Sequence, residues 1–276
     1  MKKAINQFSL PQSSMEDFLE SSKVAGFDGV EVIVSEDGVL TPETSKETID
    51  KIAREAKSIG IEICSVCSAL LYTTYPITSP NLEIRNKGIS ILDRCIEIAS
   101  ILEADTVLVV PGMVTEETFY LDALDVSKQV IEKLGSKAKN YGINLALENG
   151  GMKFLASPVE FREFIDSLNN PYIGAYFDTA NAMIEGYPEQ WIHILGRRIK
   201  KVHFKDFKAS VRIFPEAFTQ LLQGDVNWQK VMNELRKIEY NDYIVAEIPP
   251  YNIYPKKLLK NTLTNMNLIL SGVDNM

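Results

Sequence analysis

Lys200-Lys201-Val202-His203-Phe204-Lys205-Asp206 is the stretch of this sequence that decides the fold. Side chains of an extended strand alternate between two faces, so Val202 and Phe204 share one face. Lys201, His203 and Lys205 share the other. A strand with one apolar and one polar face needs polar partners for its polar side. The stretch therefore predicts a strand that is covered by apolar packing outside and faces polar side chains inside.

Three further strand-like runs have a carboxylate at their C-terminal end. They are Asn144–Glu148, Ile173–Asp178 and Tyr243–Glu247. With His203 they supply Glu, Asp, His and Glu at the ends of four buried strands. A barrel would gather these side chains, so the sequence predicts a set of metal ligands made of Glu148, Asp178, His203 and Glu247.

Strand-like and helix-like segments alternate through the whole chain. Eight such units fit within the 276 residues, and their strands are short and apolar, as a parallel sheet covered by helices requires. This pattern predicts an α/β fold, a single (β/α)8 TIM barrel that spans residues 1–276 as one domain. An open doubly wound sheet is the alternative, but no G-x-G-x-x-G follows the first strand. In a barrel the four ligands would end strands five to eight, at the catalytic face.

The charge of the chain limits its partners. Lys and Arg total 29 and Asp and Glu total 37, which gives a net charge of -8. This balance argues against nucleic acid or an acidic membrane surface as a partner. No apolar run approaches the roughly 20 residues of a membrane helix, and the first residues resemble a strand rather than a signal peptide. We expect a cytoplasmic protein with a small-molecule partner, and the sequence leaves open whether it forms a homo-oligomer.

Three other features carry separate predictions. Cys64 and Cys67 form a C-x-x-C motif, which is typical of redox or zinc sites. They lie in a strand-like run, where a spacing of three places the thiols on opposite faces, so we predict two buried thiols. His193 lies in a helical pattern and is expected on the surface. The loop from Ser68 to Pro80 is long enough to predict an active-site loop.

The donor types indicate which ion would bind. Two Glu, one Asp and one His provide mostly oxygen, which suits Mn²⁺, Mg²⁺ or Co²⁺ with positions left for a substrate. A closed structural zinc site would need more Cys and His. We predict one divalent ion, Mn²⁺ first, with Mg²⁺, Co²⁺ or Zn²⁺ as alternatives. Taken singly, Asp178 could instead cap a helix and His203 could be a core histidine, but four matched strand ends favour the ligand set.

Several motifs together carry a resemblance to a known family. They are Leu147-Glu148-Asn149, Phe177–Asn181, Val202–Asp206, Gly224–Trp228 and Ala246-Glu247. In order and spacing they resemble the sugar phosphate isomerase/epimerase group of xylose-isomerase-like barrels, over nearly the whole chain. That group includes ketose 3-epimerases, pentulose-phosphate 3-epimerases, hydroxypyruvate isomerase and inosose dehydratase. The resemblance implies a metal held by Glu148, Asp178, His203 and Glu247, and it implies that Glu148 and Glu247 move the protons.

Two positions depart from the free-ketose 3-epimerases. Asn181 stands where those enzymes usually have His, and Ala209 stands where they have Arg. The motif His203-Phe204-Lys205-Asp206 is more similar to the pentulose-phosphate epimerase and inosose dehydratase branches. The sugar and its phosphorylation therefore stay open. The related apurinic endonucleases need a histidine-rich site with three metals, which a chain with two His cannot build.

The expected function is a metal-dependent epimerase or isomerase of a ketose or ketose phosphate. The ion would polarise the carbonyl and stabilise an enediolate, while one glutamate removes a proton and the other returns it. Lys205 and Asn181 are expected to contact the substrate, and Glu31 is either a substrate contact or a structural carboxylate. A dehydratase of a polyol-derived ketone is one alternative. A non-catalytic sugar-binding barrel is another, although it would not need two bases.

Overall fold

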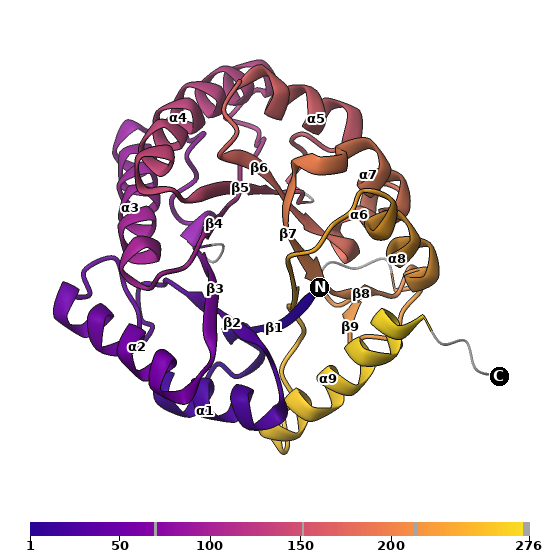
Figure 1. Cartoon of the computed structure of the whole chain (residues 1–276). Helices are drawn as coiled ribbons and strands as arrows, with labels where there is room; N and C mark the ends of the chain where they lie inside the picture. Colours follow the sequence, from indigo (N-terminus) through magenta and orange to yellow (C-terminus); the bar gives the residue numbers. More distant parts are fainter. Residues whose placement is uncertain (69–70, 151, 212–214, 273–276) are drawn as a thin grey trace.

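Eight parallel strands close into a barrel in the order β1-β10-β7-β6-β5-β4-β3-β2 (Figure 1). The computed structural model describes residues 1–68, 71–150, 152–211 and 215–272. The predicted (β/α)8 barrel is confirmed. Its strands are β1 Lys2–Asn6, β2 Gly29–Ile33, β3 Glu62–Cys67, β4 Thr106–Val109, β5 Asn144–Glu148, β6 Ile173–Asp178, β7 Ile199–Phe204 and β10 Tyr243–Ala246.

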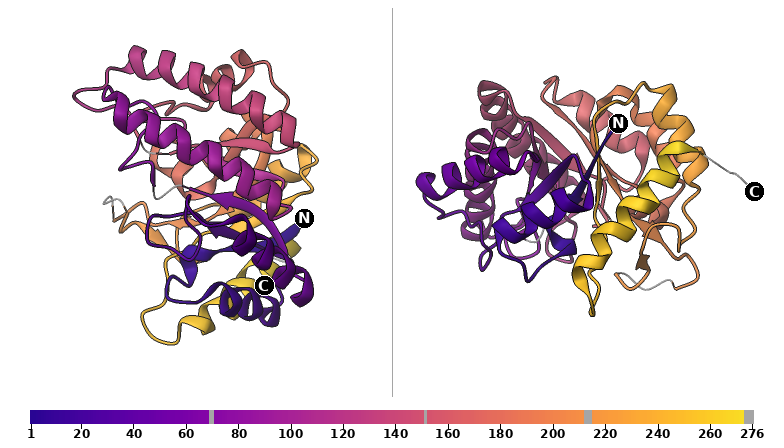
Figure 2. Two further views of the ribbon diagram at one scale, coloured as in Figure 1. Left: turned by 90° about the vertical axis from the view of Figure 1, so that its left-hand side faces the viewer. Right: turned by 60° about the horizontal axis from the view of Figure 1, so that its bottom comes forward.

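Helices form a ring around the strands, and α3 and α4 pack side by side on one flank (Figure 2). Side-chain caps fix several helix starts, as where Ser14 accepts a hydrogen bond from the backbone of Asp17. Among the residues that the structure describes, no helix is both long and apolar enough to cross a membrane. The helices are α1 Met15–Ala25, α2 Lys46–Ile59, α3 Leu82–Ile101, α4 Tyr120–Tyr141, α5 Pro158–Ser167, α6 Thr179–Glu185, α7 Pro188–Leu195, α8 Trp228–Lys237 and α9 Pro255–Ser271, with short 3-10 turns η1 Gln7–Ser9 and η3 Gly196–Arg198.

The two cysteines of the C-x-x-C motif correct one prediction. Both are buried, as expected, but both lie in the cluster of apolar side chains inside the barrel. The register between β2 and β3 shifts after Val30, so Glu31 pairs with Ser65 and not with Cys64. The additional residue changes the alternation of the strand. A spacing of three therefore does not place Cys64 and Cys67 on opposite faces.

Strand β7 and the residue that follows it carry three polar side chains inward at three depths, as the alternation predicted. Lys201 is the deepest and is fully buried at the N-terminal end of the barrel. Its Nζ lies 2.9 Å from Asp105 Oδ1 and 2.8 Å from Asp242 Oδ1. His203 lies above it and Lys205 lies nearest to the mouth. Lys201 is thus the centre of a group of ion pairs that closes the bottom of the barrel.

Lys201→Met should lower the free energy of unfolding by about 1–3 kcal/mol, the usual cost of leaving buried polar groups without partners. Asp105 and Asp242 are partly exposed, so water can replace part of the lost interaction. Urea titration of both proteins would measure the difference. Lys133→Met removes an exposed lysine of α4 and is the matched control. An equal loss in the two variants would contradict a structural role for Lys201.

Between β7 and α8 the chain leaves the barrel as an excursion, described for residues 206–211 and 215–227. It includes β8 Asp206–Phe207, which pairs antiparallel with β9 Phe218–Thr219. The buried carboxylate of Asp206 accepts hydrogen bonds from Leu222 N at 2.9 Å, Val226 N at 3.2 Å and Trp228 Nε1 at 3.2 Å. Both ends of the excursion are thus fixed by one side chain.

Gly224 is required by the same arrangement. A Cβ at this position would lie 2.2 Å from Asp206 Oδ1 and 2.7 Å from Phe207 N. The sequence indicated the Gly224–Trp228 motif only through the family resemblance. The structure gives its physical reason, which is the close approach of this backbone to Asp206.

Candidate metal centre

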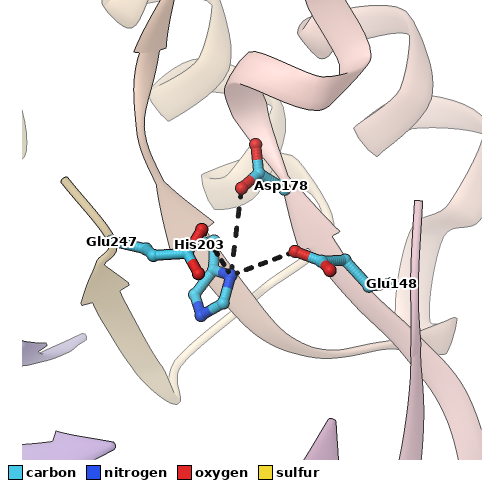
Figure 3. Close-up of side chains that lie close together, drawn as sticks. All are labelled: Glu148, Asp178, His203 and Glu247. Carbon is cyan, nitrogen blue, oxygen red and sulfur yellow. Dashed lines mark hydrogen bonds and ion pairs between the residues drawn. The ribbon is translucent and has the colours of Figure 1, made fainter. Parts of the chain in front are cut away.

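Four side chains from the C-terminal ends of adjacent strands meet at the mouth of the barrel (Figure 3). Glu148, Asp178 and His203 come from β5, β6 and β7, and Glu247 directly follows β10. One ligand atom from each lies within 4.8 Å of all the others. His203 Nδ1 is 3.3 Å from Glu148 Oε1 and 3.8 Å from both Asp178 Oδ2 and Glu247 Oε2. The predicted ligands are therefore brought together.

Glu31 fixes the orientation of the His203 ring. Glu31 Oε1 lies 2.7 Å from His203 Nε2, on the side of the ring away from Nδ1. The same fully buried carboxylate accepts hydrogen bonds from Asn6 Nδ2 at 2.5 Å, Ser65 Oγ at 2.7 Å and Tyr176 OH at 2.6 Å. Burial alone would raise the pKa of Glu31, but the charge and hydrogen bond of His203 outweigh it and lower the pKa. Glu31 therefore has the contacts of a structural carboxylate, and a contact with substrate stays a prediction.

Glu31→Gln should weaken the binding of Mn²⁺ by about 10–100-fold, the usual effect of changing a residue that orients a metal-binding histidine. The amide cannot accept from His203 and also satisfy three other donors, so the ring would lose its fixed orientation. Calorimetric titration with Mn²⁺ would measure the affinity. Glu62→Gln, at the exposed start of β3, is the control. Unchanged affinity in a folded Glu31→Gln protein would refute this role.

Asp178 caps a helix and also belongs to the group of candidate metal ligands. Its Oδ1 accepts a hydrogen bond of 2.7 Å from Asn181 N and so caps α6. Its Oδ2 is buried and, among the described residues, accepts no hydrogen bond, although Lys205 Nζ lies 3.1 Å away. A buried carboxylate oxygen without a hydrogen bond, beside two more carboxylates and a ring nitrogen, fits a divalent cation. The types and positions of these four side chains are therefore those expected of a metal site.

The two glutamates have different environments. Burial raises the pKa of Glu148 to about 7, and the charge of Glu247 adds to the shift. Burial acts on Glu247 in the same direction, but the charges of Lys205 and His203 outweigh it and lower the pKa. Lys205 Nζ is in direct contact with Glu247 Oε2. At neutral pH Glu247 is thus held as a carboxylate, while Glu148 is close to its titration point.

We call the four candidate ligands Glu148, Asp178, His203 and Glu247 the metal cluster. This cluster borders a cavity of about 210 Å³ at the mouth of the barrel. Glu148 and Glu247 line it, as do Lys205 and Asn181, the two predicted substrate contacts. The Lys205 ammonium group is already paired with carboxylates and lies 4.5 Å from the centroid of the Phe218 ring. Asn181 Nδ2 donates a hydrogen bond of 3.0 Å to Asn149 O. The structure places both at the cavity, and their contact with substrate stays a prediction.

Sequence analysis missed most of the remaining lining. Only Tyr72 lies in the Ser68–Pro80 loop that its length singled out, and residues 69–70 of that loop are outside the described residues. The other members lie outside the barrel strands, in segments without a motif, and no periodic pattern marks them. These are Phe8, Val110, Gly150, Met152, Pro215, Phe218, Ile248 and Pro249.

Comparisons with solved structures show that the fold is shared with known proteins. The structure described as L-ribulose 3-epimerase has a TM-score of 0.81 at 20% identity, with 98% of this chain and 94% of that chain covered. The D-psicose 3-epimerase with D-tagatose from Clostridium cellulolyticum H10 has a TM-score of 0.81 at 15% identity, with 98% and 99% covered. The IOLI protein with a binding zinc atom has a TM-score of 0.85 at 18% identity over 100% of both chains.

The comparison with curated proteins gave no match. The sequence profile of the xylose isomerase-like TIM barrel matches residues 19–268, which include all four residues of the metal cluster. The chain therefore belongs to the xylose isomerase-like TIM barrel family.

Proposed function

We propose that the protein is a metal-dependent epimerase or isomerase that acts on a ketose. The observation that carries the proposal is that Glu148 and Glu247 belong to the metal cluster and also line one cavity. Two carboxylates at such a place can serve as base and acid for the same substrate. The similarity to an L-ribulose 3-epimerase and a D-psicose 3-epimerase supports a ketose as the substrate class.

Glu148, Asp178, His203 and Glu247 would hold one divalent ion. When bound, the ion supplies Lewis-acid polarisation of a carbonyl group. The oxygen-rich donor set favours Mn²⁺ as the ion, with Mg²⁺, Co²⁺ and Zn²⁺ as alternatives. The zinc atom in the similar IOLI structure supports a divalent ion as the cofactor.

In the proposed reaction one glutamate takes a proton from the substrate and the other glutamate gives a proton to it. Glu247, which Lys205 keeps ionised, removes the proton from the carbon next to the carbonyl. Glu148, the other glutamate that lines the cavity, gives a proton to the substrate. Return of a proton to the opposite face of that carbon gives epimerisation, and return to the former carbonyl carbon gives isomerisation. The roles of the two glutamates exchange in the reverse direction.

A deuterium-exchange screen tests the proposal. The protein would be incubated with Mn²⁺ in D₂O with a panel of ketoses and ketose phosphates. The expected result is deuterium next to the carbonyl together with a new epimer or isomer, read by NMR and mass spectrometry. Loss of water from the sugar would indicate a dehydratase instead. Absence of exchange with every sugar, in protein shown to contain the metal, would refute the proposed function.

A further inference from the structure

One side of the cavity is an apolar wall, formed by Phe8, Pro215, Phe218, Ile248 and Pro249. Phe8 follows β1, Ile248 and Pro249 follow β10, and the other two belong to the excursion after β7. Strands β1, β10 and β7 are neighbours in the barrel. The wall is therefore one continuous sector of the mouth, built by three segments that are far apart in the sequence.

Hydrogen bonds between these segments fix the wall. Ser9 Oγ donates to Ile248 O at 3.2 Å, which ties the turn after β1 to the end of β10. Gln220 Nε2 donates to Pro249 O at 2.8 Å, which ties the excursion to the same segment. Each of these two carbonyl groups already has a protein partner. The side chains that the wall presents to a ligand carry no hydrogen-bonding group.

The charged groups that line the cavity, among the described residues, are Glu148, Glu247 and Lys205, while Tyr72 and Asn181 add uncharged polar groups. Among the described residues that line it, Lys205 is the only cation. Its ammonium group contacts Glu247 and lies 3.1 Å from Asp178 Oδ2, so two carboxylates balance its charge. A phosphate group would have to compete with those carboxylates for one lysine, beside the carboxylate of Glu148.

We infer, on the basis of the proposed function, that the substrate is an unphosphorylated deoxyketose whose terminal methyl group packs on the apolar wall. The carbonyl end of the sugar would lie toward the metal cluster, and the other end would reach the wall. A hydroxyl group there would give up its hydrogen bonds to water without a replacement. A phosphate dianion would lose more, since no uncompensated cation among the described lining residues receives it. A methyl group loses nothing and gains apolar contact.

Two matched series of sugars test the inference. One contains 6-deoxy-D-fructose, D-fructose and D-fructose 6-phosphate, and the other contains the three corresponding forms of D-tagatose. The readout is kcat/KM for deuterium incorporation with Mn²⁺, normalised to the open-chain fraction of each sugar. The kcat/KM of the 6-deoxy sugar should be higher than that of its parent by about 10-fold or more, the usual effect of a methyl group in an apolar pocket. The phosphate should be the poorest of each series.

Variants of the wall give a second readout that does not depend on the solution chemistry of the sugars. Phe8→Gln places an amide on the wall at a residue that is 38% exposed, so the fold should tolerate it. It should lower the ratio of kcat/KM between 6-deoxy sugar and parent by about 10-fold. Phe119→Gln, at a residue that is 69% exposed and does not line the cavity, should leave the ratio unchanged.

The outcomes separate the inference from the function on which it rests. If the parent sugar or the phosphate has the same kcat/KM for exchange as the deoxy sugar, the inference is overturned. The proposed epimerase or isomerase function would still stand. A ratio that Phe8→Gln does not change also overturns it. Absence of exchange with all six sugars and with the wider ketose panel overturns both the function and the inference.

Discussion

Replacing Glu148 or Glu247 by Gln should lower turnover by about 10²-fold or more, the usual scale of acid-base catalysis. The amide has the shape of the carboxylate but cannot take up or release the proton. Both side chains lie in the metal cluster and line the cavity, so each change acts at the reacting atoms of the proposed substrate. Turnover would be measured at saturating Mn²⁺, with the metal content of each variant checked.

Deuterium exchange would show whether the two glutamates act as a pair. If they serve opposite faces of the substrate, a variant that lacks one of them should still exchange deuterium into one epimer without forming the other. Glu163→Gln, on the exposed surface of α5, is the control for the loss of a carboxylate elsewhere. Near-normal turnover in both variants with the metal bound would mean that the glutamates are ligands only, and the proposed mechanism would be wrong.

Removal of the metal with a chelator should abolish activity, and addition of Mn²⁺ or another divalent ion should restore it. Binding should also stabilise the fold, by about 2.7 kcal/mol at an ion concentration 100 times the dissociation constant. The physical reason is the grouping of three carboxylates at the mouth of the barrel. Activity and the melting temperature would be followed in the same titration. Full activity after verified removal of the metal would contradict the prediction.

The pH dependence of metal binding has a definite sign. The ion needs Glu148 and His203 without their protons. The pKa of Glu148 is about 7, and although burial lowers the pKa of His203, the surrounding carboxylates, Glu31 first, raise it well above its usual value. The apparent affinity should therefore fall as the pH decreases through 7, and binding should release protons to the buffer. A titration in buffers of different ionisation enthalpy would measure the release.

The sequence was most informative where geometry leaves few choices. In a closed parallel barrel the C-terminal ends of all strands meet at one face, so residues that end four strands had to lie near one another. For the same reason the inward positions of β7 were predictable from alternation alone. The assignment of residues 1–276 to one domain, the cytoplasmic location and the preference for Mn²⁺ stay predictions.

The errors and omissions have a common physical origin. The register shift beside Glu31 depends on how β2 and β3 fit together, and neither strand alone contains a signal for it. This shift made the placement of Cys64 and Cys67 wrong. The support that Glu31 gives to His203 spans the interior of the barrel, across 172 positions of the sequence. The wall around Phe8 and Phe218 was missed because loops without periodicity acquire their neighbours only in the folded chain.

The anchoring of the excursion on Asp206 suggests how new activities could arise in this barrel. Because one carboxylate fixes Leu222, Val226 and Trp228, the intervening chain can change in length without moving β7 or α8. Each doubling of a flexible loop costs only about 0.6 kcal/mol in closure entropy. The segment between Asp206 and Leu222 is therefore a natural site for recombination. A graft there would replace Pro215 and Phe218 and so pair a different substrate preference with an inherited metal centre.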